Sequence, residues 1–581
     1  MNILLIDPIP ELERAFREEG HDVKVLRLGG GVFYLPGLLA REGFSPDLVL
    51  HQETLGVRSY FGGLEQLCCP TIFWALDTHL NMFWHKWYAR LFDIVLTPHI
   101  SLFEKLPVHL RPGQLSRFAW PGEKRAFIPH EQRPHSLGLC ARITPHRRIR
   151  SWMVELLSPK GLELRDDLSH EEMMAFYDAS RVVPNESIAN EVNFRLMEGA
   201  SSGSLLLSPD VGEDQNALLE PGKEFFIYRD GIELLELAAW ADNHPAAAGR
   251  MGRLAMLRIQ AEHLPRQRVR QILGGLSGWT QTRLTGAPGD LAFWLTLALQ
   301  IRNGVLGLNP LSHAREGLAL VQAVKNTVNP GRETLFLAGQ AMAQIFCLFA
   351  EGESEPRAPK LAHSLCCDIL AHMGSKKERE DARDTAVEDV LLLNPDLLGV
   401  ASAFALNEGR VDMARLFWMK NMRPSERAAP ESVAELCACW AGVCENAGRA
   451  YNAGFSCNPA EGFLPECALS WLIYGRYTVP DTLEFFAPRF HALLADKPEF
   501  LSLYFAHLAE HSVAVPDNWR WQEEYGLVNI RACRVVEGLH ELQEAGRRAR
   551  QQGCERFFWG KLNSWRPGGR NWEQWLEALD A

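Results

Sequence analysis

At 581 residues the chain exceeds the length that one hydrophobic core usually serves, so we expect about two to four domains. Its content of 47% hydrophobic and 23% charged residues is that of a soluble globular protein. The formal charge of −12 argues against a nucleic-acid binder, because neutralising phosphates requires a clustered basic surface.

Neither a membrane span nor an export signal is visible in the sequence. No apolar run reaches the roughly 18 uninterrupted residues that cross a bilayer. The start, MNILLIDPIPELERAF, lacks a basic segment and a cleavage-site pattern and is typical of a strand and a helix. We therefore expect a cytoplasmic protein. The thirteen cysteines form no C-x-x-C pair, which favours reduced, buried thiols over disulfides or zinc ligands.

Residues 1–132 alternate short apolar runs with helical spans, which predicts a parallel sheet in a Rossmann-like lobe. The runs are NILLID, PDLVLH, PTIFWAL and FDIVLTP. The turn after the first run is DPIPEL, so the G-x-G-x-x-G dinucleotide fingerprint is absent and a dehydrogenase is disfavoured. The glycines at 29–31 indicate a tight turn or the border of a ligand cleft.

Residues 133–275 contain a second α/β pattern, with the runs SLGLCARI, GLELRDD and RVVPN. Ligands of open α/β sheets bind at the carboxyl ends of strands, which places Arg142, Asn185 and Ser187 on such a rim. Arg142, directly after a strand, is the preferred phosphate clamp. Arg148, in ITPHRRIR, is a further candidate, because guanidinium groups chelate phosphate oxygens. A solvated basic turn is the alternative.

Three polar residues lie in one amphipathic helical run before the strand SLLLS: Asn193, Arg195 and Glu198. Arg195 and Glu198 are three residues apart and therefore share a helical face. The start of a helix offers free N–H groups to an anion, and a carboxylate one turn further accepts hydrogen bonds from ribose hydroxyls. An ordinary core helix with a surface ion pair is the alternative.

The pattern N-x-R-x-x-E-x-x-x-x-G from Asn193 to Gly203, followed by an apolar strand and PGKEFFIYRD, resembles the nucleotide-sugar half of GT-B glycosyltransferases. It most resembles the CgeB-like (spore-maturation) group, and the likeness covers residues 1 to about 275. The resemblance implies an acceptor-side lobe (1–132) and a donor-side lobe (133–275). It also implies a donor-site role for Glu224, for which capping is the alternative, and a closing helix with a His and an Arg several residues apart. The segment EHLPRQRVRQIL offers His263, Arg266, Arg268 and Arg270 for these places.

Enzymes that resemble this fold generally need no catalytic metal. The chain also lacks a D-x-D motif, which would chelate a metal ion beside a diphosphate. We expect no metal site and no cofactor, since the nucleotide-sugar is a substrate. Related retaining enzymes usually have two glutamates eight positions apart, and eight residues before Glu198 stands Asn190. This departure leaves open a degenerate, non-catalytic descendant that acts through protein–protein interaction.

The candidate catalytic pair is Asp77 and His79, just past the apolar run PTIFWAL. His79 has the intrinsic pKa of a general base and Asp77 would orient it. The alternative is that Asp77 caps the next helix and that His79 is a surface residue.

From residue 276 to 581 the pattern becomes helical. The segments LNEGRVDMARLF and ENAGRAYNAGFS place Gly409 and Gly448 at matching positions, as in tetratricopeptide-like arrays, and an irregular bundle competes with that interpretation. Such an array would offer a surface to a protein acceptor or partner.

The sequence therefore predicts an α/β region followed by an all-α region. The α/β region has two Rossmann-like lobes of GT-B type, and the α-helical repeat-like array follows them. The predicted function is a metal-independent glycosyltransferase, of the hexosyltransferase type, that uses a nucleotide-sugar donor.

Overall fold

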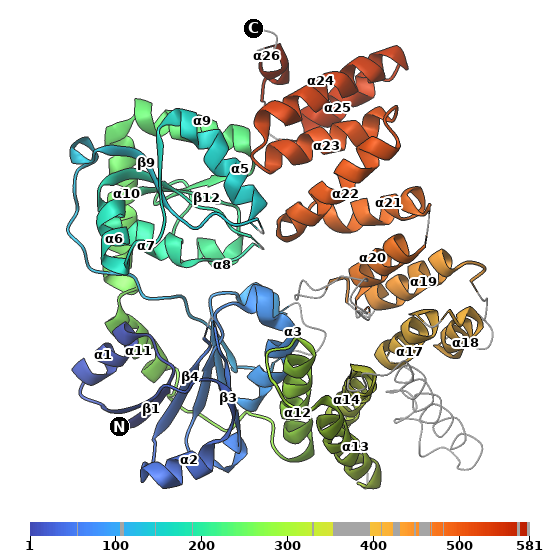
Figure 1. Ribbon diagram of the computed structural model, residues 1–581. Coiled ribbons are helices and arrows are strands. Elements are labelled where there is room, and N and C mark those ends of the chain that lie inside the picture. The colour runs from blue at the N-terminus through green and yellow to red at the C-terminus, as the bar shows by residue number, and fades with distance from the viewer. Residues whose placement is uncertain are drawn as a thin grey trace. The chain divides into compact units, whose positions relative to one another are not determined.

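The protein forms two compact units, described here from a computed structural model and drawn in Figure 1. Unit 1 comprises residues 1–119 and 269–486, and unit 2 comprises residues 120–268 and 487–581. The segment 276–581, predicted as one helical domain, thus contributes to both units. The structure describes residues 1–54, 56–104, 110–145, 147–188, 190–327, 331–351, 395–407, 409–421, 430–446, 449–451, 465, 467–479, 481–565 and 570–577.

The sheet of unit 1 has six strands in the order β2-β1-β4-β6-β7-β8, and every neighbouring pair is parallel. Its central strands are buried along their whole length, as expected for a parallel sheet that is covered on both faces. The strands are β1 (Asn2–Ile6), β2 (Asp22–Leu26), β4 (Leu48–Gln52), β6 (Thr71–Trp74), β7 (Ile94–Thr97) and β8 (Leu115–Arg117), and the short strands β3 (Gly31–Tyr34) and β5 (Ser59–Gly62) pair separately.

Helices of unit 1 cover the sheet and then continue as an all-helical region. Helix α12 packs against α3, and beyond it α13 packs with α14, α17 with α18, and α19 with α20. The helices are α1 (Pro10–Glu18), α2 (Leu35–Glu42), α3 (Thr78–Tyr88), α4 (Ile100–Glu104), α11 (Pro265–Gly274), α12 (Gly286–Arg302), α13 (Pro310–Asn326), α14 (Arg332–Glu351), α17 (Pro395–Asn407), α18 (Val411–Asn421), α19 (Val433–Asn446), α20 (Ala468–Thr478) and α21 (Leu483–Leu494). Of these, α11 and α21 cross the unit boundaries.

The sheet of unit 2 is again parallel, with five strands in the order β10-β9-β11-β12-β13. The strands are β9 (His135–Cys140), β10 (Leu162–Arg165), β11 (Ser180–Pro184), β12 (Leu205–Pro209) and β13 (Phe226–Tyr228). The helices that accompany them are α5 (Arg148–Leu157), α6 (His170–Asp178), α7 (Phe194–Ser202), α8 (Glu213–Asn216), α9 (Gly231–Asn243) and α10 (Pro245–Glu262).

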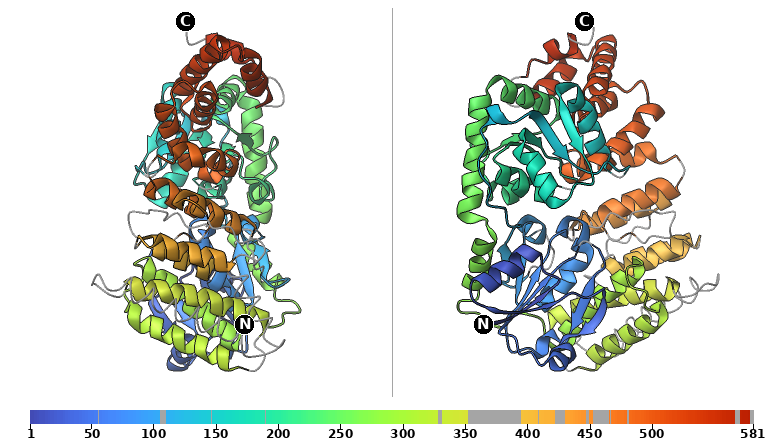
Figure 2. Two further views of the ribbon diagram at one scale, coloured as in Figure 1. Left: turned by 90° about the vertical axis from the view of Figure 1, so that its right-hand side faces the viewer. Right: turned by 60° about the vertical axis from the view of Figure 1, so that its left-hand side comes forward.

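Helices lie on both faces of this sheet. Helix α5 contacts α9, whereas α7 contacts α6 and α10, and Figure 2 shows the long helix α10 running beside the sheet. The close approach of α10 to the end of α7 requires a glycine: a Cβ at Gly252 would lie 2.2 Å from the Gly203 carbonyl oxygen. Gly203 itself ends α7 in the left-handed conformation, with φ 73°.

The C-terminal helices of unit 2 pack on α9, and their aromatic side chains fill a hydrophobic core. Trp572 is 2% exposed in this core, and Trp559, Trp565 and Trp575 pack against it. The helices are α22 (Leu501–Ala514), α23 (Trp519–Arg531), α24 (Val535–Gln551), α25 (Glu555–Ser564) and α26 (Trp572–Glu577).

The structure confirms the predicted fold class, because two parallel α/β sheets precede a region that contains helices but no strand among its described residues. The second half of the predicted sequence repeat, with Gly448, lies mainly outside the described residues, so a tetratricopeptide-like array remains a prediction. No described helix combines the length and the apolar character needed to span a bilayer.

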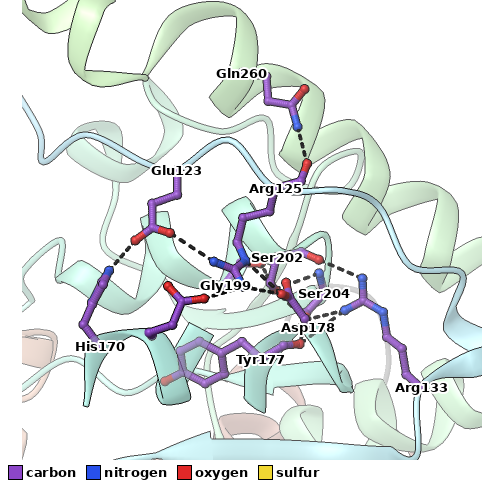
Figure 3. Close-up of polar contacts among 11 residues, drawn as sticks. Glu123, Arg125, Arg133, His170, Tyr177, Asp178, Gly199, Ser202, Ser204 and Gln260 are labelled. Atoms are coloured by element: carbon purple, nitrogen blue, oxygen red, sulfur yellow. Dashed lines mark hydrogen bonds and ion pairs between the residues drawn. The ribbon is translucent and has the colours of Figure 1, made fainter. Parts of the chain in front are cut away.

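Arg133 organises the core of unit 2 at the ends of α6 and α7, as Figure 3 shows. Its guanidinium donates to the carbonyl oxygens of Tyr177 (3.3 Å), Ser180 (2.8 Å) and Ser202 (2.7 Å), and to Ser204 Oγ (2.8 Å). The residue is 2% exposed. Burial lowers the pKa of Arg133 to about 10, so the group remains charged at neutral pH.

We expect Arg133→Met to lower the free energy of unfolding by about 3 kcal/mol or more, because bonds from a charged donor contribute about 1.5–3 kcal/mol each and their acceptors would stay buried. Urea denaturation followed by circular dichroism measures the change. Arg165→Met, whose side chain is 53% exposed beside Glu163, is the control and should cost less than about 1 kcal/mol. Equal losses in the two variants would contradict the central role of Arg133.

Candidate functional site

The sheet of unit 2 has a topological switch point between β9 and β11. The chain leaves β9 through α5 to β10 on one side and then returns through α6 to β11 on the other. At such a point the connections diverge and open a crevice at the carboxyl ends of the strands, where α/β proteins bind ligands. Cys140 at the end of β9 and Asn185 after β11 lie at this switch point, so we expect a ligand crevice between them.

Arg195 joins the two strand ends at the switch point. Its Nη1 donates to Asn185 Oδ1 at 3.0 Å and its Nη2 to the Cys140 carbonyl oxygen at 3.3 Å. The hydroxyl of Tyr177 donates to the same carbonyl at 3.4 Å. Burial opposes the charge on Arg195, but Tyr177, Glu186 and Glu198 around it raise its pKa above the ordinary value. The guanidinium is therefore a fixed positive charge in the crevice.

Helix α7 begins at this crevice without a side-chain cap. Asn193 occupies the N-cap position, but its side chain makes no capping hydrogen bond to the helix. Its Nδ2 donates instead to Asn185 Oδ1 (2.9 Å) and to the Glu186 carbonyl oxygen (2.8 Å). Among the described residues, Asn193 Oδ1 and Arg195 Nε are buried side-chain atoms without a hydrogen-bond partner. The first N–H groups of the helix and the Arg195 guanidinium together provide donors for an anion.

Glu198 lies one turn further along α7 and is half-buried. Burial raises the pKa of Glu198, Arg195 and His170 act in the opposite direction, and Glu123 adds to the increase. Glu123 and His170 contact each other in Figure 3. No hydrogen bond of the Glu198 side chain is found within the described part of the chain, so its oxygens can accept hydrogen bonds from a ligand.

A buried ion pair supports the loop after β11. Arg150 donates from Nε (3.0 Å) and Nη2 (2.8 Å) to Glu186 Oε2, and both residues are buried. Arg150 Nη1 also donates to the Arg142 carbonyl oxygen at 3.1 Å. Burial lowers the pKa of Arg150, and Glu186 offsets part of that decrease. The pair thus fixes the two loops at the switch point relative to each other.

The remaining predicted donor residues occupy different surroundings. Arg142 is exposed and meets Asp167 at 3.3 Å, and Arg148 is exposed at the first position of α5. Ser187 Oγ donates to Glu191 Oε2 at 2.6 Å. Glu224 is 4% exposed and accepts hydrogen bonds from the Glu220 amide (2.7 Å) and Arg258 Nε (3.2 Å), so it supports its own turn and α10.

Asn185 was predicted as a rim residue, and the structure shows it as the centre of the network. It is 1% exposed; its Nδ2 donates to Ser208 Oγ (3.0 Å), and its carbonyl oxygen accepts from the Tyr228 hydroxyl (2.6 Å). With the bonds from Asn193 and Arg195, its polar atoms are engaged within the protein. Asn185 therefore positions the side chains of Asn193 and Arg195.

The predicted catalytic pair lies in unit 1, at the start of α3. Asp77 is half-buried at the N-cap position, where its side chain makes no capping hydrogen bond. His79 is 7% exposed and its ring centroid lies 5.4 Å from that of His99. The sequence leaves two interpretations of His79, a general base or a surface residue. The low exposure of His79 does not fit a surface residue.

Sequence reasoning missed Glu53, which shapes the turn before α3. Its Oε2 accepts hydrogen bonds from the amides of Leu76 (2.7 Å) and Asp77 (3.0 Å), and its Oε1 lies 3.1 Å from His85 Nε2. Burial would raise the pKa of Glu53, but His85 and the two amides lower it below the ordinary value. The available signal was its position directly after the strand run PDLVLHQ.

His263 ends α10 and is held between two protein groups. Its Nδ1 accepts from Arg268 Nη2 at 2.8 Å, so the proton is on Nε2, which donates to the Leu218 carbonyl oxygen at 3.2 Å. Burial and Arg268 lower the pKa of His263 to about 4. The ring is therefore neutral at physiological pH.

This shift makes folding stability depend on pH. An unfolded histidine titrates near about 6.5, so from about pH 6.5 down to about 4 the unfolded chain takes up the additional proton and stability falls. We expect His263→Gln to remove up to about 1.4 kcal/mol per pH unit of this decrease. Chemical denaturation at about pH 7 and about pH 5 measures it. His244→Gln, at an exposed position, should keep the wild-type slope.

One family model covers the region that has just been described. Residues 138–274 match the model described as "Glycosyl transferase-like". The matched segment is about a quarter of the chain and runs from β9 through α7 to α11. No curated protein sequence matches the chain.

Several solved structures align with about half of the chain at low identity. Sucrose-phosphate synthase from Thermosynechococcus elongatus is 12% identical, with 48% of this chain and 99% of that chain covered and a TM-score of 0.37. The Anabaena protein HepE, solved with UDP-glucose, is 12% identical, with 48% and 100% covered and a TM-score of 0.34. The pneumococcal O-GlcNAc transferase GtfA, solved with UDP and GlcNAc, is 12% identical, with 42% and 59% covered and a TM-score of 0.31.

Proposed function

We propose that this protein is a glycosyltransferase that moves a sugar from a nucleotide-sugar donor to an acceptor, of the hexosyltransferase type and without a catalytic metal. The observation that supports it most is Arg195, which joins β9 and β11 at the switch point inside the segment that matches the glycosyl transferase-like family. A CgeB-like relationship is part of the proposal and rests on the pattern from Asn193 to Gly203.

The diphosphate of the donor binds at the start of α7 in this proposal. A departing nucleoside diphosphate develops negative charge, and preorganised donors that face this charge lower the barrier. The uncapped helix start and the fixed Arg195 guanidinium supply such donors without an ion. Arg142 follows β9 and Arg148 begins α5, and both side chains are exposed. They are the further phosphate-binding residues of this proposal.

The ribose is bound by Glu198. Its carboxylate lies one helical turn from Arg195, which matches the order of phosphate and pentose in a nucleotide that lies along the helix start. Asn185 Oδ1 and the Cys140 carbonyl oxygen accept hydrogen bonds from Arg195 and keep the guanidinium in position.

The acceptor hydroxyl is activated by His79 with Asp77 in this proposal. A neutral histidine is a suitable base, and the backbone before α3 is held by Glu53 through the amides of Leu76 and Asp77. Helices of unit 1 pack in pairs, and a repeat-like array of such pairs would offer an extended surface, so we propose that this region binds a protein acceptor or a protein partner.

A second candidate function is a scaffold of the same fold that has lost catalysis. It is favoured by Asn190, which stands where the resemblance expects a glutamate and has a left-handed backbone with φ 59°. Its Nδ2 lies 3.4 Å from the Val211 carbonyl oxygen, so it is part of the local turn.

Comparing a nucleoside diphosphate with inorganic pyrophosphate tests the ribose-binding and the phosphate-binding parts of the donor site separately. We expect UDP, GDP, ADP or dTDP to raise the melting temperature, by about 2–4 °C for each kcal/mol that ligand binding adds to the free energy of unfolding. Glu198→Gln should weaken the response to the active nucleotide while leaving the response to inorganic pyrophosphate unchanged, because pyrophosphate has no ribose. Arg195→Gln should weaken both responses.

The control variant is Arg165→Gln, which should respond to both ligands like the wild type. If no nucleotide changes the melting temperature, the donor site is refuted. Release of nucleoside diphosphate from the matching nucleotide-sugar then distinguishes the enzyme from the scaffold: the enzyme releases it, more slowly in His79→Gln, and the scaffold does not.

A further inference from the structure

A carboxylate is buried in the hydrophobic core of the C-terminal helices of unit 2. Glu523 is 1% exposed and lies four residues from Trp519 and from Leu527, so the three side chains share one face of α23. Helix α23 packs on α24, which in turn contacts α25, and Figure 1 shows the three helices together. The core residues on the neighbouring helices include Leu539, Leu542, Ala545, Phe558 and Leu562. An acidic side chain therefore lies among mainly apolar groups.

The carboxylate of Glu523 lacks the contacts that stabilise an ionised group. Among the described residues, neither of its oxygens has a hydrogen-bond partner. Lys561 of α25 is the cation that reaches it, with Nζ 3.9 Å from Oε2. Burying a carboxylate as an ion without hydrogen bonds is costly, whereas its protonated form carries no net charge. The geometry thus favours a neutral Glu523 in the packed helices.

Lys561 does not fully compensate a charge on Glu523, because it already has a carboxylate partner. Its Nζ contacts Glu524 Oε1 directly. The other oxygen of Glu524 accepts from the Tyr504 hydroxyl of α22 at 3.5 Å, and this hydroxyl lies 2.5 Å from His491 Nδ1 of α21. One cation thus faces two carboxylates, and ionised Glu523 would add an uncompensated negative charge to the core.

The remaining groups around Glu523 do not change this balance. Arg520, on the same helix, is exposed and lies over the Trp519 ring, so solvent and salt screen its charge. Burial raises the pKa of Glu523 to about 7, while Lys561 and Arg520 act in the opposite direction. The side chain therefore exchanges its proton in the neutral pH range. The helices α24 and α26 contribute apolar side chains to this core, namely Leu542, Ala545, Trp572 and Leu576.

We propose that Glu523 is a proton-dependent switch for the packing of α25 and α26. With the proton bound, both helices stay packed on α23 and α24, and loss of the proton separates them from this core. The change extends to the α/β part of unit 2, since Arg570, just before α26, pairs with Asp230 at the N-cap of α9 at 2.9 Å. This regulatory device goes beyond the proposed transferase function and does not depend on it.

Hydrogen exchange measured by mass spectrometry on the full chain, from about pH 5 to about pH 8, tests the switch. A solvated glutamate binds its proton only below about pH 4.3, so the separated state releases a proton that the packed state holds up to about pH 7. We expect the protection factors of α25 and α26, which correct for the intrinsic pH dependence of exchange, to fall by up to about tenfold per pH unit up to about pH 7. Glu523→Gln keeps a neutral side chain and should remove this fall.

Glu537→Gln is the matched control, since it neutralises a carboxylate at an exposed position of α24 and should keep the wild-type fall. Lys561→Met removes the cation that opposes the proton, so the fall should continue to higher pH than in the wild type. Circular dichroism verifies that the variants fold, and Lys561→Met decides the question if Glu523→Gln does not fold. Protection that is independent of pH in the wild type, a fall that persists in Glu523→Gln, or a fall that ends at the wild-type pH in Lys561→Met would overturn the switch.

Discussion

The buried guanidinium of Arg133 is the contact on which the candidate site depends. It donates to carbonyl oxygens at the end of α6, at the start of β11 and at the end of α7, with no carboxylate among these acceptors. The ends of the two helices present partial negative charge, so one cation stabilises both at once. Because Tyr177 lies on α6 and Arg195 on α7, this contact also sets the distance between the groups that meet at the Cys140 carbonyl.

A hierarchy of contacts then leads from the core to the crevice. Arg133 binds the C-terminal ends of α6 and α7. Asn185 binds residues at the start of α7, and the pair of Arg150 and Glu186 fixes the loop between β11 and α7. Each member is buried and hydrogen-bonded, which rigidifies the network. The exposed arginines, Arg142 and Arg148, are outside this hierarchy and remain adjustable.

Much of the fold follows from the sequence, because apolar runs of strand length separated by helical spans leave few alternatives to parallel sheets. The grouping of Asn185, Asn193 and Arg195 was also predictable, since strand ends and the next helix start meet at one edge. Which polar side chain faces a ligand was not. Asn185, predicted at the rim, has four partners within the protein. Glu224, for which capping and donor contact were both open, accepts hydrogen bonds from the Glu220 amide and from Arg258. Such pairing depends on three-dimensional neighbours, which spacing does not specify.

The dependence of unit 2 on its last helices has a practical consequence for truncation. A Cβ at Gly231 would lie 2.9 Å from the Cys533 Cα, so the first turn of α9 rests directly on the connection between α23 and α24. Cutting the chain after the α/β segments would uncover Ile232 and would leave Asp230 as a buried charge without Arg570. The excised α/β part would then expose an apolar surface and lose stability, so a stable fragment has to retain the C-terminal helices that cover Ile232 and the segment with Arg570.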